Sequence, residues 1–402
     1  MSRYVGNFMF HPVGHGLFYS GTIKNLSTDK QVSDKQYSFV YDCGGKNKTI
    51  IDDAIKGAKL PSKIDLLIIS HFHKDHINGV LKLIEKHEVK TVILPYLDAK
   101  SKVLYIAELK EEKSEDEAEL TAFIQDPQDF LKQHSKQHSV KEVFFIKEGK
   151  YHQPKRNDGD QNGRGNNNES FKSFSWDCEI IKENDKKIII GNGNYFSPIW
   201  VFNFFMPKRD EAKFKGINLE GIVDSNTDEV NWKNIDENKW NEIQNQMKPL
   251  RNNASNLVCA HGPTDNVFVQ KICNNKFIPS EQFKRCLECD FLCHYHYCHW
   301  HEGNIGFQFL TGDAEIDDQD AFLTNYQSDL KKSILFQVPH HGSDENWKDW
   351  FSEYQPFCYL WPVTHNADHK YGLPSAKFSY IAPYSVTEYE TTRLGIQIHF
   401  VC

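Results

Sequence analysis

No stretch of this 402-residue sequence approaches the run of about 20 apolar residues that a membrane-spanning helix requires. The first residues, MSRYVGNFMFHPVGHG, also lack the basic start and the apolar stretch of a cleavable secretory signal. We therefore predict a soluble protein that resides in the cytoplasm and has no membrane partner.

An excess of basic residues is also missing, because 47 Lys and Arg stand against 55 Asp and Glu and the formal net charge is -8. A chain with this balance has no general attraction for polyanions, so a nucleic acid would need a local cationic surface or bound metal. Lys155, Arg156 and Arg164 form a small basic segment, for which a solvated surface loop is the simpler interpretation. Composition therefore neither indicates nor excludes nucleic acid as a partner.

Cysteine is too scarce for a dense disulfide framework, since the chain has ten and six of them lie between Cys259 and Cys298. In CLECDFLCHYHYCHWH the spacing of Cys286 and Cys289 is that of a zinc knuckle, and Cys293 and Cys298 follow closely. The alternation in FLCHYHYCHW is equally typical of a strand. A structural zinc and a plain strand therefore both stay open for this segment.

The order of expected elements indicates a single α/β domain over residues 1–402. Short aromatic and β-branched strands open the chain, and helical and strand-like segments then alternate up to residue 97. Residues 100–170 are charged and polar, and we expect an insertion there. Residues 260–304 are expected to form a second insertion, a Cys/His-rich hairpin away from the catalytic site. Strands return in ASNLVCA, IGFQFLTGDAEI, ILFQVPHHGS, FCYLWPVTH and LGIQIHFVC.

The densest group of metal-ligand residues is HFHKDH, which supplies His71, His73, Asp75 and His76. It follows IDLLIIS, a run that is apolar except for Asp65 and Ser70 and is typical of a strand covered on both faces. Imidazole and carboxylate side chains suit zinc, manganese or iron, and one tight turn can direct such side chains to two ions. A lone HxH is more often a solvated loop, but four ligand residues together indicate a metal site.

This stretch resembles the HxHxDH signature of the metallo-β-lactamase superfamily, and other segments follow in that superfamily's order. They are a strand that ends in Asp42 before Cys-Gly-Gly, a Gly-Asp pair at Asp313, and His340 in VPHHGS. The resemblance implies a four-layer αββα sandwich with insertions. It also implies that Asp313 bridges two metals, that His340 completes the site of Asp75 and His76, and that Asp42 orients a ligand.

Within that superfamily, the sequence resembles the β-lactamase-like domain of the competence protein ComEC and its soluble relatives. VGHGLF resembles its VGQGD phrase, RNNASNLV its NNxSLV strand, FLTGDAE its LLTGD, and VPHHGS its HHGS loop. As in that subgroup, the usual histidine before the middle strand is absent, and Asn253 lies there as a residue expected to support the site. The chain departs from the subgroup at His15, where a glutamine is usual, and at Leu373.

The leading functional hypothesis is a metal-dependent hydrolase, a phosphodiesterase or nuclease that acts on DNA or RNA through metal-activated water. One or two zinc or manganese ions would serve, besides any structural zinc. Asp75 or the bridging Asp313 would orient the nucleophile. Contact with the substrate or protonation of the leaving oxygen would fall to the catalytic His341 and Ser343 and to the binding residues His365 and His369. Two alternatives stay open: hydrolysis of a small ester, lactone or cyclic nucleotide, and a binding protein with a degenerate metal site.

Overall fold

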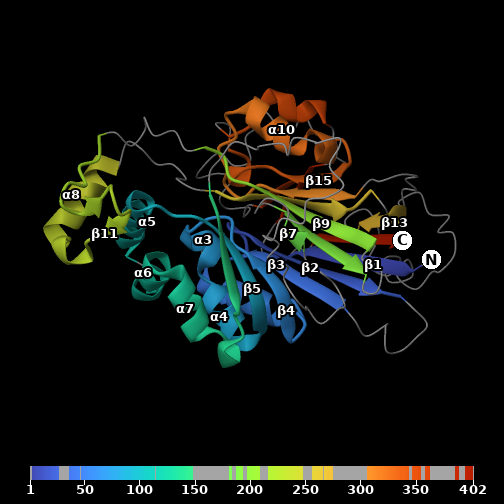
Figure 1. The fold of residues 1–402 in the computed structure, drawn as a ribbon, viewed down its shortest axis with the longest axis horizontal. Coiled ribbons are helices and arrows are strands. Elements are labelled where there is room, and N and C mark those ends of the chain that lie inside the picture. Colours follow the sequence, from blue (N-terminus) through green and yellow to red (C-terminus); the bar gives the residue numbers. More distant parts are fainter. Residues whose placement is uncertain are drawn as a thin grey trace, which may run out of the picture.

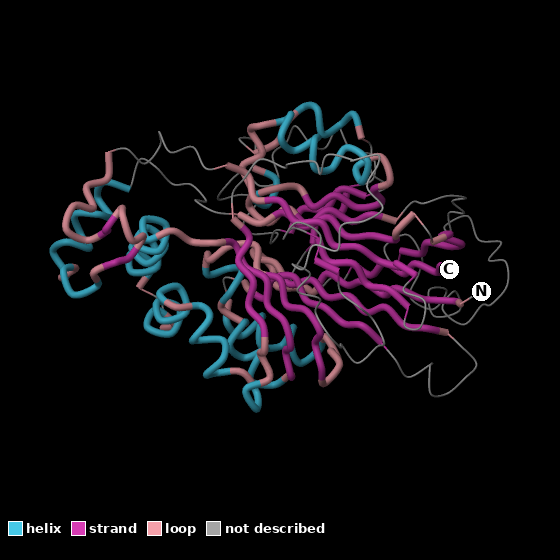
Figure 2. The backbone as a smooth tube through the Cα atoms, in the orientation of Figure 1, coloured by secondary structure: helices cyan, strands magenta, loops and turns pink. Residues whose placement is uncertain are grey.

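The computed structural model describes residues 2–26, 36–45, 47–113, 115–147, 181–182, 187–192, 197–208, 216–247, 256–265, 267–274, 306–343, 346–354, 358–362, 385–388 and 394–401. Two large sheets lie face to face, and helices cover the outer face of each (Figures 1 and 2). This arrangement confirms the predicted four-layer αββα sandwich.

The first sheet has eight strands, antiparallel on one side and parallel on the other. Strands β13 to β3 pair antiparallel, and β3 to β6 pair parallel. In spatial order the strands are β13 (Phe268–Asn274), β18 (Leu394–Val401), β1 (Arg3–Phe10), β2 (Phe18–Asn25), β3 (Gln36–Cys43), β4 (Lys63–Ile68), β5 (Glu88–Pro95) and β6 (Glu142–Ile146).

The second sheet also has eight strands and repeats this division. Its strands β7 to β14 pair antiparallel, whereas β14 to β17 pair parallel. In spatial order they are β17 (Ser385–Glu388), β16 (Cys358–Pro362), β15 (Ser333–Gln337), β14 (Phe307–Leu310), β12 (Val258–Pro263), β9 (Ser197–Phe205), β8 (Lys187–Asn192) and β7 (Ile181–Lys182). A separate small hairpin pairs β10 (Val223–Asp224) with β11 (Glu229–Val230).

Most of the described helices lie on the side of the first sheet (Figure 1). They are α2 (Lys48–Gly57), α3 (Lys74–Ile77), α4 (Val80–Lys86), α5 (Ala99–Glu112), α6 (Glu117–Gln125), α7 (Pro127–His134), η1 (Lys136–His138), η4 (Trp232–Asn234) and α8 (Glu237–Met247). The second sheet is covered by α10 (Gln319–Leu330), with η6 (His340–Gly342) and η7 (Asp349–Glu353) nearby.

Three apolar cores correspond to the three interfaces between these layers. The core between the sheets is rich in large rings, such as Phe8, Phe39 and Trp200, all at most 1% exposed. A second core joins the first sheet to its helices, and a third joins the second sheet to α10 and η7. Each fully buried ring of this kind stabilises the fold by roughly 2 kcal/mol relative to exposure, so the sandwich holds its loops on a rigid base.

Local sequence accounts for the elements that lead to the candidate site. Strand β4 is buried along its whole length after Lys63, as its apolar run, broken only by Asp65, predicts. Helix α2 begins where the Asn47 side chain accepts hydrogen bonds from the backbone N–H groups of Thr49 and Ile50. Its apolar face of Ile51, Ala54 and Ile55 is buried, as the spacing predicts.

The segment predicted to be a polar insertion, residues 100–170, is described as far as residue 147. There it forms α5, α6, α7 and β6, and β6 pairs with β5 at the edge of the first sheet. Helix α5 buries eight of its 14 residues, including Val103 and Ile106, in the core over that sheet. The charged residues that make this segment look polar thus share helices with buried apolar residues.

Strands β12 and β14, which lie on either side of most of the predicted second insertion, are antiparallel neighbours. The chain between them does not run on as a simple hairpin, because it first forms β13 at the edge of the other sheet. This position of β13 is stabilised by apolar burial, because the side chains of Val269 and Ile272, and of Val267 just before the strand, pack in the core between the sheets. The cluster of Cys286, Cys289, Cys293 and Cys298 lies outside the described residues, so its role stays a prediction.

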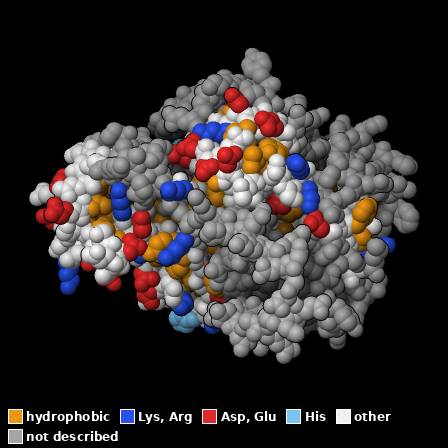
Figure 3. Space-filling view, turned by 45° about the horizontal axis from the view of Figure 1, so that its top comes forward, with side chains coloured by type: hydrophobic (Ala, Val, Ile, Leu, Met, Phe, Trp, Pro, Cys, Tyr) orange, Lys and Arg blue, Asp and Glu red, His pale blue; other side chains and the backbone are white. Residues whose placement is uncertain are grey.

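Among the described helices, none is long and apolar enough to cross a membrane. On the face shown in Figure 3, the acidic and basic side chains of described residues are interspersed. The visible described surface therefore offers no broad field of one sign to a charged partner.

Candidate metal centre

The predicted site residues come from the carboxyl ends of parallel strands in both sheets. Asp42 lies at the end of β3, and Ser70 and His71 follow β4 in the first sheet. Asp313 follows β14 and the His340-His341 pair follows β15 in the second sheet. Since the sheets face each other, these four turns meet at one edge of the sandwich, and side chains distant in sequence converge there.

A first group of candidate ligands consists of His71, His76 and Asp313, whose ligand atoms lie within 4.8 Å of one another. Asp313 Oδ2 lies 3.7 Å from His71 Nε2, and Asp313 Oδ1 lies 3.3 Å from His76 Nε2. All three side chains are buried, and both histidines are fully so. This group joins the HFHKDH turn to the second sheet.

A second group consists of His15, Asp75 and His341, again with ligand atoms within 4.8 Å of one another. Asp75 Oδ2 lies 3.5 Å from His15 Nε2 and 3.4 Å from His341 Nε2. The two groups adjoin, because His341 Nε2 is also 3.7 Å from Asp313 Oδ1. Asp313 therefore lies between two sets of candidate ligands.

These separations fit ligands around a cation better than direct hydrogen bonds. Bond lengths of about 2.1 Å around a tetrahedral ion place neighbouring ligand atoms roughly 3.4 Å apart. A direct N–H···O hydrogen bond is shorter, at about 2.7–3.2 Å. His71 Nε2 and His76 Nε2 are also buried without a hydrogen-bond partner among the described residues. Both nitrogens face Asp313, so the residues present fit divalent metal ions.

The charge states of the site also suit a cation. Burial raises the pKa of Asp313 and Asp75, but neighbouring histidines outweigh it and hold both pKa values well below the usual range. Burial and the nearby His76 lower the pKa of His71 well below its ordinary value, which leaves that imidazole neutral. Burial alone would lower the pKa of His76, yet Asp313 and Asp42 raise it well above normal. Positive charge is thus favoured between these two carboxylates.

Asp42 lies behind the first group and contacts one of its histidines. Its Oδ1 accepts a hydrogen bond from Ser70 N and its Oδ2 one from Ser70 Oγ, both 2.6 Å long. Asp42 Oδ2 also lies 2.8 Å from His76 Nδ1, which directs His76 Nε2 toward Asp313. Ser70 Oγ lies 2.8 Å from His71 Nδ1, so the same pair orients both histidines.

The structure brings His341, and not the predicted His340, into the second group. Both residues have positive φ, 49° and 54°, and the turn that they form after β15 brings the His341 ring to Asp75. His340 Nδ1 lies 3.1 Å from Asn346 Oδ1, although His340 still helps to lower the pKa of Asp313. Ser343 closes this turn, because its N–H donates to the His340 carbonyl oxygen.

His73 is another predicted ligand that lies in neither group of the described residues. Its Nε2 is 2.9 Å from Glu108 Oε2 on α5, and its ring packs edge-on against Tyr105 of the same helix. The carboxylate of Glu108 raises the pKa of His73 against the effect of burial. Sequence analysis missed this partner because Glu108 falls in the segment that was expected to be an insertion.

Asn256 is a second residue that the sequence analysis missed. It is 4% exposed just before β12, and its Oδ1 accepts a hydrogen bond of 3.3 Å from Asp313 N. The signal was present, because Asn256 belongs to the RNNASNLV phrase from which Asn253 was chosen. Asn253, His365 and His369 lie outside the described residues, so their predicted roles stay predictions.

Buried histidine alone does not define the site, as His261 on β12 demonstrates. This residue is fully buried between the sheets, among Phe8, Phe39 and Phe202. Its Nε2 lies 2.9 Å from the Tyr19 hydroxyl, and burial lowers its pKa to about 3. His261 is therefore a neutral core residue that links the two sheets.

Comparison with known families agrees with this geometry. Residues 32–150 match the model of the metallo-beta-lactamase superfamily. The match runs from the segment before β3 to just beyond β6, so it includes Asp42 and the HFHKDH turn but not Asp313 or His341. It indicates a metal-dependent hydrolase that uses divalent ions, as predicted. A search of curated proteins found no match, so the ComEC-like subgroup stays a prediction.

Proposed function

We propose that the protein hydrolyses phosphodiesters, with DNA or RNA as its substrate class, at a centre that holds two divalent ions. The observation that carries this proposal is the position of Asp313 Oδ1, 3.3 Å from His76 Nε2 and 3.7 Å from His341 Nε2. One carboxylate thus contacts both groups of candidate ligands. Paired ions are the arrangement that proteins use to hold a phosphoryl group during displacement by water.

The residues divide into those that would hold the ions and those that would orient the holders. His71, His76 and Asp313 would hold one ion, and Asp75, His341 and the shared Asp313 the other. Such ions, when bound, polarise a phosphoryl oxygen and lower the pKa of water.

The residues behind these ligands keep them in place without touching substrate. The carboxylate of Asp42 fixes His76 through Nδ1, and the Ser70 hydroxyl lies against Nδ1 of His71. The Asn256 side chain fixes the backbone of Asp313. Because these contacts are buried, the imidazoles are oriented before any ligand arrives, which lowers the entropy cost of forming the site.

A small ester, lactone or cyclic nucleotide is the second candidate substrate. The formal net charge of -8 favours it, because a long polyanion gains no general attraction from such a chain. The two substrate classes share the same site, so direct assays are needed to separate them.

The decisive experiment assays the purified chain with zinc, with manganese or with a chelator. The substrates are bis(p-nitrophenyl) phosphate, single- and double-stranded DNA, RNA, and p-nitrophenyl acetate as a simple ester. We expect phosphodiester cleavage that requires metal and falls by about 1,000-fold in Asp313→Asn and His76→Ala, because several kcal/mol of stabilisation are lost.

A matched control is His134→Ala, which removes an exposed histidine from α7 and should leave activity unchanged. Cleavage of the acetate ester alone would move the assignment to the second candidate. Cleavage of no substrate by metal-loaded protein would support the non-catalytic alternative, and activity that persists in Asp313→Asn would reject the assigned centre.

A further inference from the structure

His15 occupies a place in the site that the HxHxDH pattern does not include. It lies in the turn between β1 and β2, 60 residues before Asp75, and is 8% exposed. Its Nε2 lies 3.5 Å from Asp75 Oδ2, and its ring centroid is 4.0 Å from that of His341. The His15 side chain therefore joins Asp75 and His341 in the second group, although it comes from a different turn of the chain.

The three ligand atoms of this group are arranged as around a common centre. Asp75 Oδ2 lies between two imidazole nitrogens at similar distances, 3.5 Å to His15 and 3.4 Å to His341. Both distances are close to the roughly 3.4 Å expected between ligands of one tetrahedral ion. Three turns from different parts of the chain supply these atoms.

The turn that carries His15 is built onto the backbone of Asp75 itself. Leu17 N donates a 3.2 Å hydrogen bond to the Asp75 carbonyl oxygen, and Gly44 N donates one of 3.0 Å to the Leu17 carbonyl oxygen. Gly16 has φ of +149°, and a Cβ there would lie 2.5 Å from the Gly44 oxygen and 2.6 Å from the Asp75 oxygen. Only glycine allows this close approach, so the position of His15 relative to Asp75 is fixed by the main chain.

His11, at the start of the same turn, is a buried histidine that is not directed at the candidate ligands. It is also buried, at 3% exposed, but its Nε2 lies 2.8 Å from Ser20 Oγ and its ring packs on Phe18. It belongs to neither candidate ligand group of the described residues. The contrast within one turn separates a packing histidine from one directed at a carboxylate.

We propose that His15 Nε2 is a ligand of the cation held by Asp75 and His341. The inference rests on the metal centre of the proposed function but not on its substrate. It gives the second ion an imidazole ligand from the turn between β1 and β2, in addition to the Asp75 carboxylate of the HFHKDH turn and the His341 imidazole of the second sheet.

The test titrates metal-free protein with Zn²⁺ by calorimetry in competition with a chelator, for the parent, His15→Gln and the matched variant His11→Gln. We expect the parent to bind two ions. In His15→Gln one of the two should bind at least about 10-fold more weakly, while the other and both ions of His11→Gln keep the parent affinity.

Substitution with Co²⁺ supplies a readout of coordination rather than affinity. We expect the visible absorption of the Co²⁺-loaded protein to change in His15→Gln and to stay that of the parent in His11→Gln. Thermal unfolding in chelator checks that each variant is folded, and His15→Asn repeats the titration if the glutamine variant unfolds early. Affinities and Co²⁺ spectrum identical to the parent in the folded His15 variant would overturn the proposal.

Two further variants distinguish this failure from failure of the centre itself. His71→Ala and Asp75→Asn should each weaken Zn²⁺ binding if the centre is correct. If they do so while His15→Gln does not, only the role of His15 is rejected. If none of the three changes binding, the metal centre and the proposed function are rejected together.

Discussion

The two ends of the β3–β4 strand pair carry the same local motif in different surroundings. At the carboxyl end, Asp42 of β3 accepts hydrogen bonds from the N–H and hydroxyl of Ser70, just beyond β4. At the amino end, Asp65 of β4 accepts hydrogen bonds from the N–H and hydroxyl of Ser38 on β3, 2.8 and 3.2 Å long. Both carboxylates are buried, so each Asp-Ser pair fastens two parallel strands together.

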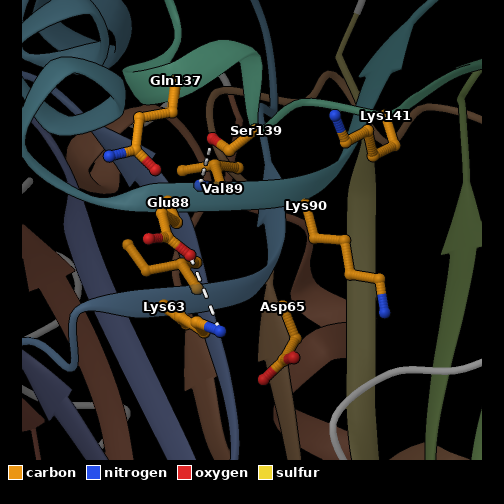
Figure 4. Close-up of a pocket in the computed structure, with 9 residues that line it drawn as sticks. Lys63, Asp65, Glu88, Val89, Lys90, Gln137, Ser139 and Lys141 are labelled. Atoms are coloured by element: carbon orange, nitrogen blue, oxygen red, sulfur yellow. Dashed lines mark hydrogen bonds and ion pairs between the residues drawn. The ribbon is translucent and has the colours of Figure 1, made fainter.

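What lies beside each pair differs. Asp42 contacts the Nδ1 of His76, and through this ring it faces the candidate ligand groups. Asp65 lines a cavity of about 400 Å³ with Lys63 and Lys90, and Figure 4 shows no imidazole among the labelled residues there. Asp65 precedes His71 by six residues, so at some 3.3 Å per strand residue it lies about 20 Å along the chain from the candidate ligands. The Asp-Ser pair by itself therefore only joins the two strands. It becomes part of a candidate metal centre at the one end where a histidine contacts the carboxylate.

The largest expected effect is that of Asp42→Asn on metal affinity. The amide keeps the size of the side chain, but it removes the charge that holds His76 Nδ1. We expect Zn²⁺ to bind about 100-fold more weakly, which corresponds to about 2.7 kcal/mol. Competition with a chromophoric chelator measures the change. An affinity equal to that of the parent would show that Asp42 does not support metal binding through His76.

A smaller effect is expected from Asp65→Asn, and on stability rather than metal binding. Burial raises the pKa of Asp65 from 3.8 to about 6, against the opposing hydrogen bonds of Ser38. The folded state therefore holds this proton more tightly than the unfolded chain. The cost of ionising Asp65 is absent below about pH 4, grows as the pH rises to about 6, and is constant above that.

Asparagine carries no such cost, so the stability of Asp65→Asn relative to the parent should increase between pH 4 and pH 7. The shift corresponds to about 3 kcal/mol, and we expect about 2 kcal/mol to remain because residual structure in the unfolded chain reduces it. Urea unfolding at several pH values measures the difference, with Zn²⁺ affinity as the control that should not change. A stability difference independent of pH would contradict the prediction.

The smallest effects come from the two serines, which sharpen the comparison. Ser70→Ala and Ser38→Ala each remove one buried hydroxyl and should each cost about 1 kcal/mol of stability. Only Ser70→Ala should also weaken Zn²⁺ binding, by roughly fivefold, because Ser70 Oγ lies 2.8 Å from His71 Nδ1. Equal Zn²⁺ affinities in the two variants would show that Ser70 does not act on the centre.

Much of the frame around the site was predictable from local patterns. The apolar run of β4, the amphipathic spacing of α2 and the position of HFHKDH after a buried strand all appear in the structure as predicted. Such features depend on neighbours a few residues apart, which a sequence displays directly. The segment after residue 100 was harder, because charged residues on the outer faces of α5 to α7 obscure the buried ones.

The choice among histidines was not predictable. His340 and His341 are adjacent and of one type, and only the fold of the turn after β15 brings the His341 ring to Asp75. His73 has the spacing of a ligand, yet a glutamate from α5 lies 2.9 Å away. His15 appeared only as a departure from a related phrase, since nothing near it in sequence reveals that its turn bonds to Asp75.

By itself the sequence determined the residue types available for metal binding and the α/β alternation that places them after strands, because both follow from side-chain chemistry and short-range periodicity. Only the tertiary structure decided which of these residues meet. Their distances depend on how the two sheets pack and on main-chain conformation in the turns. Both arise from contacts between segments that can be more than 300 residues apart, as between His15 and His341.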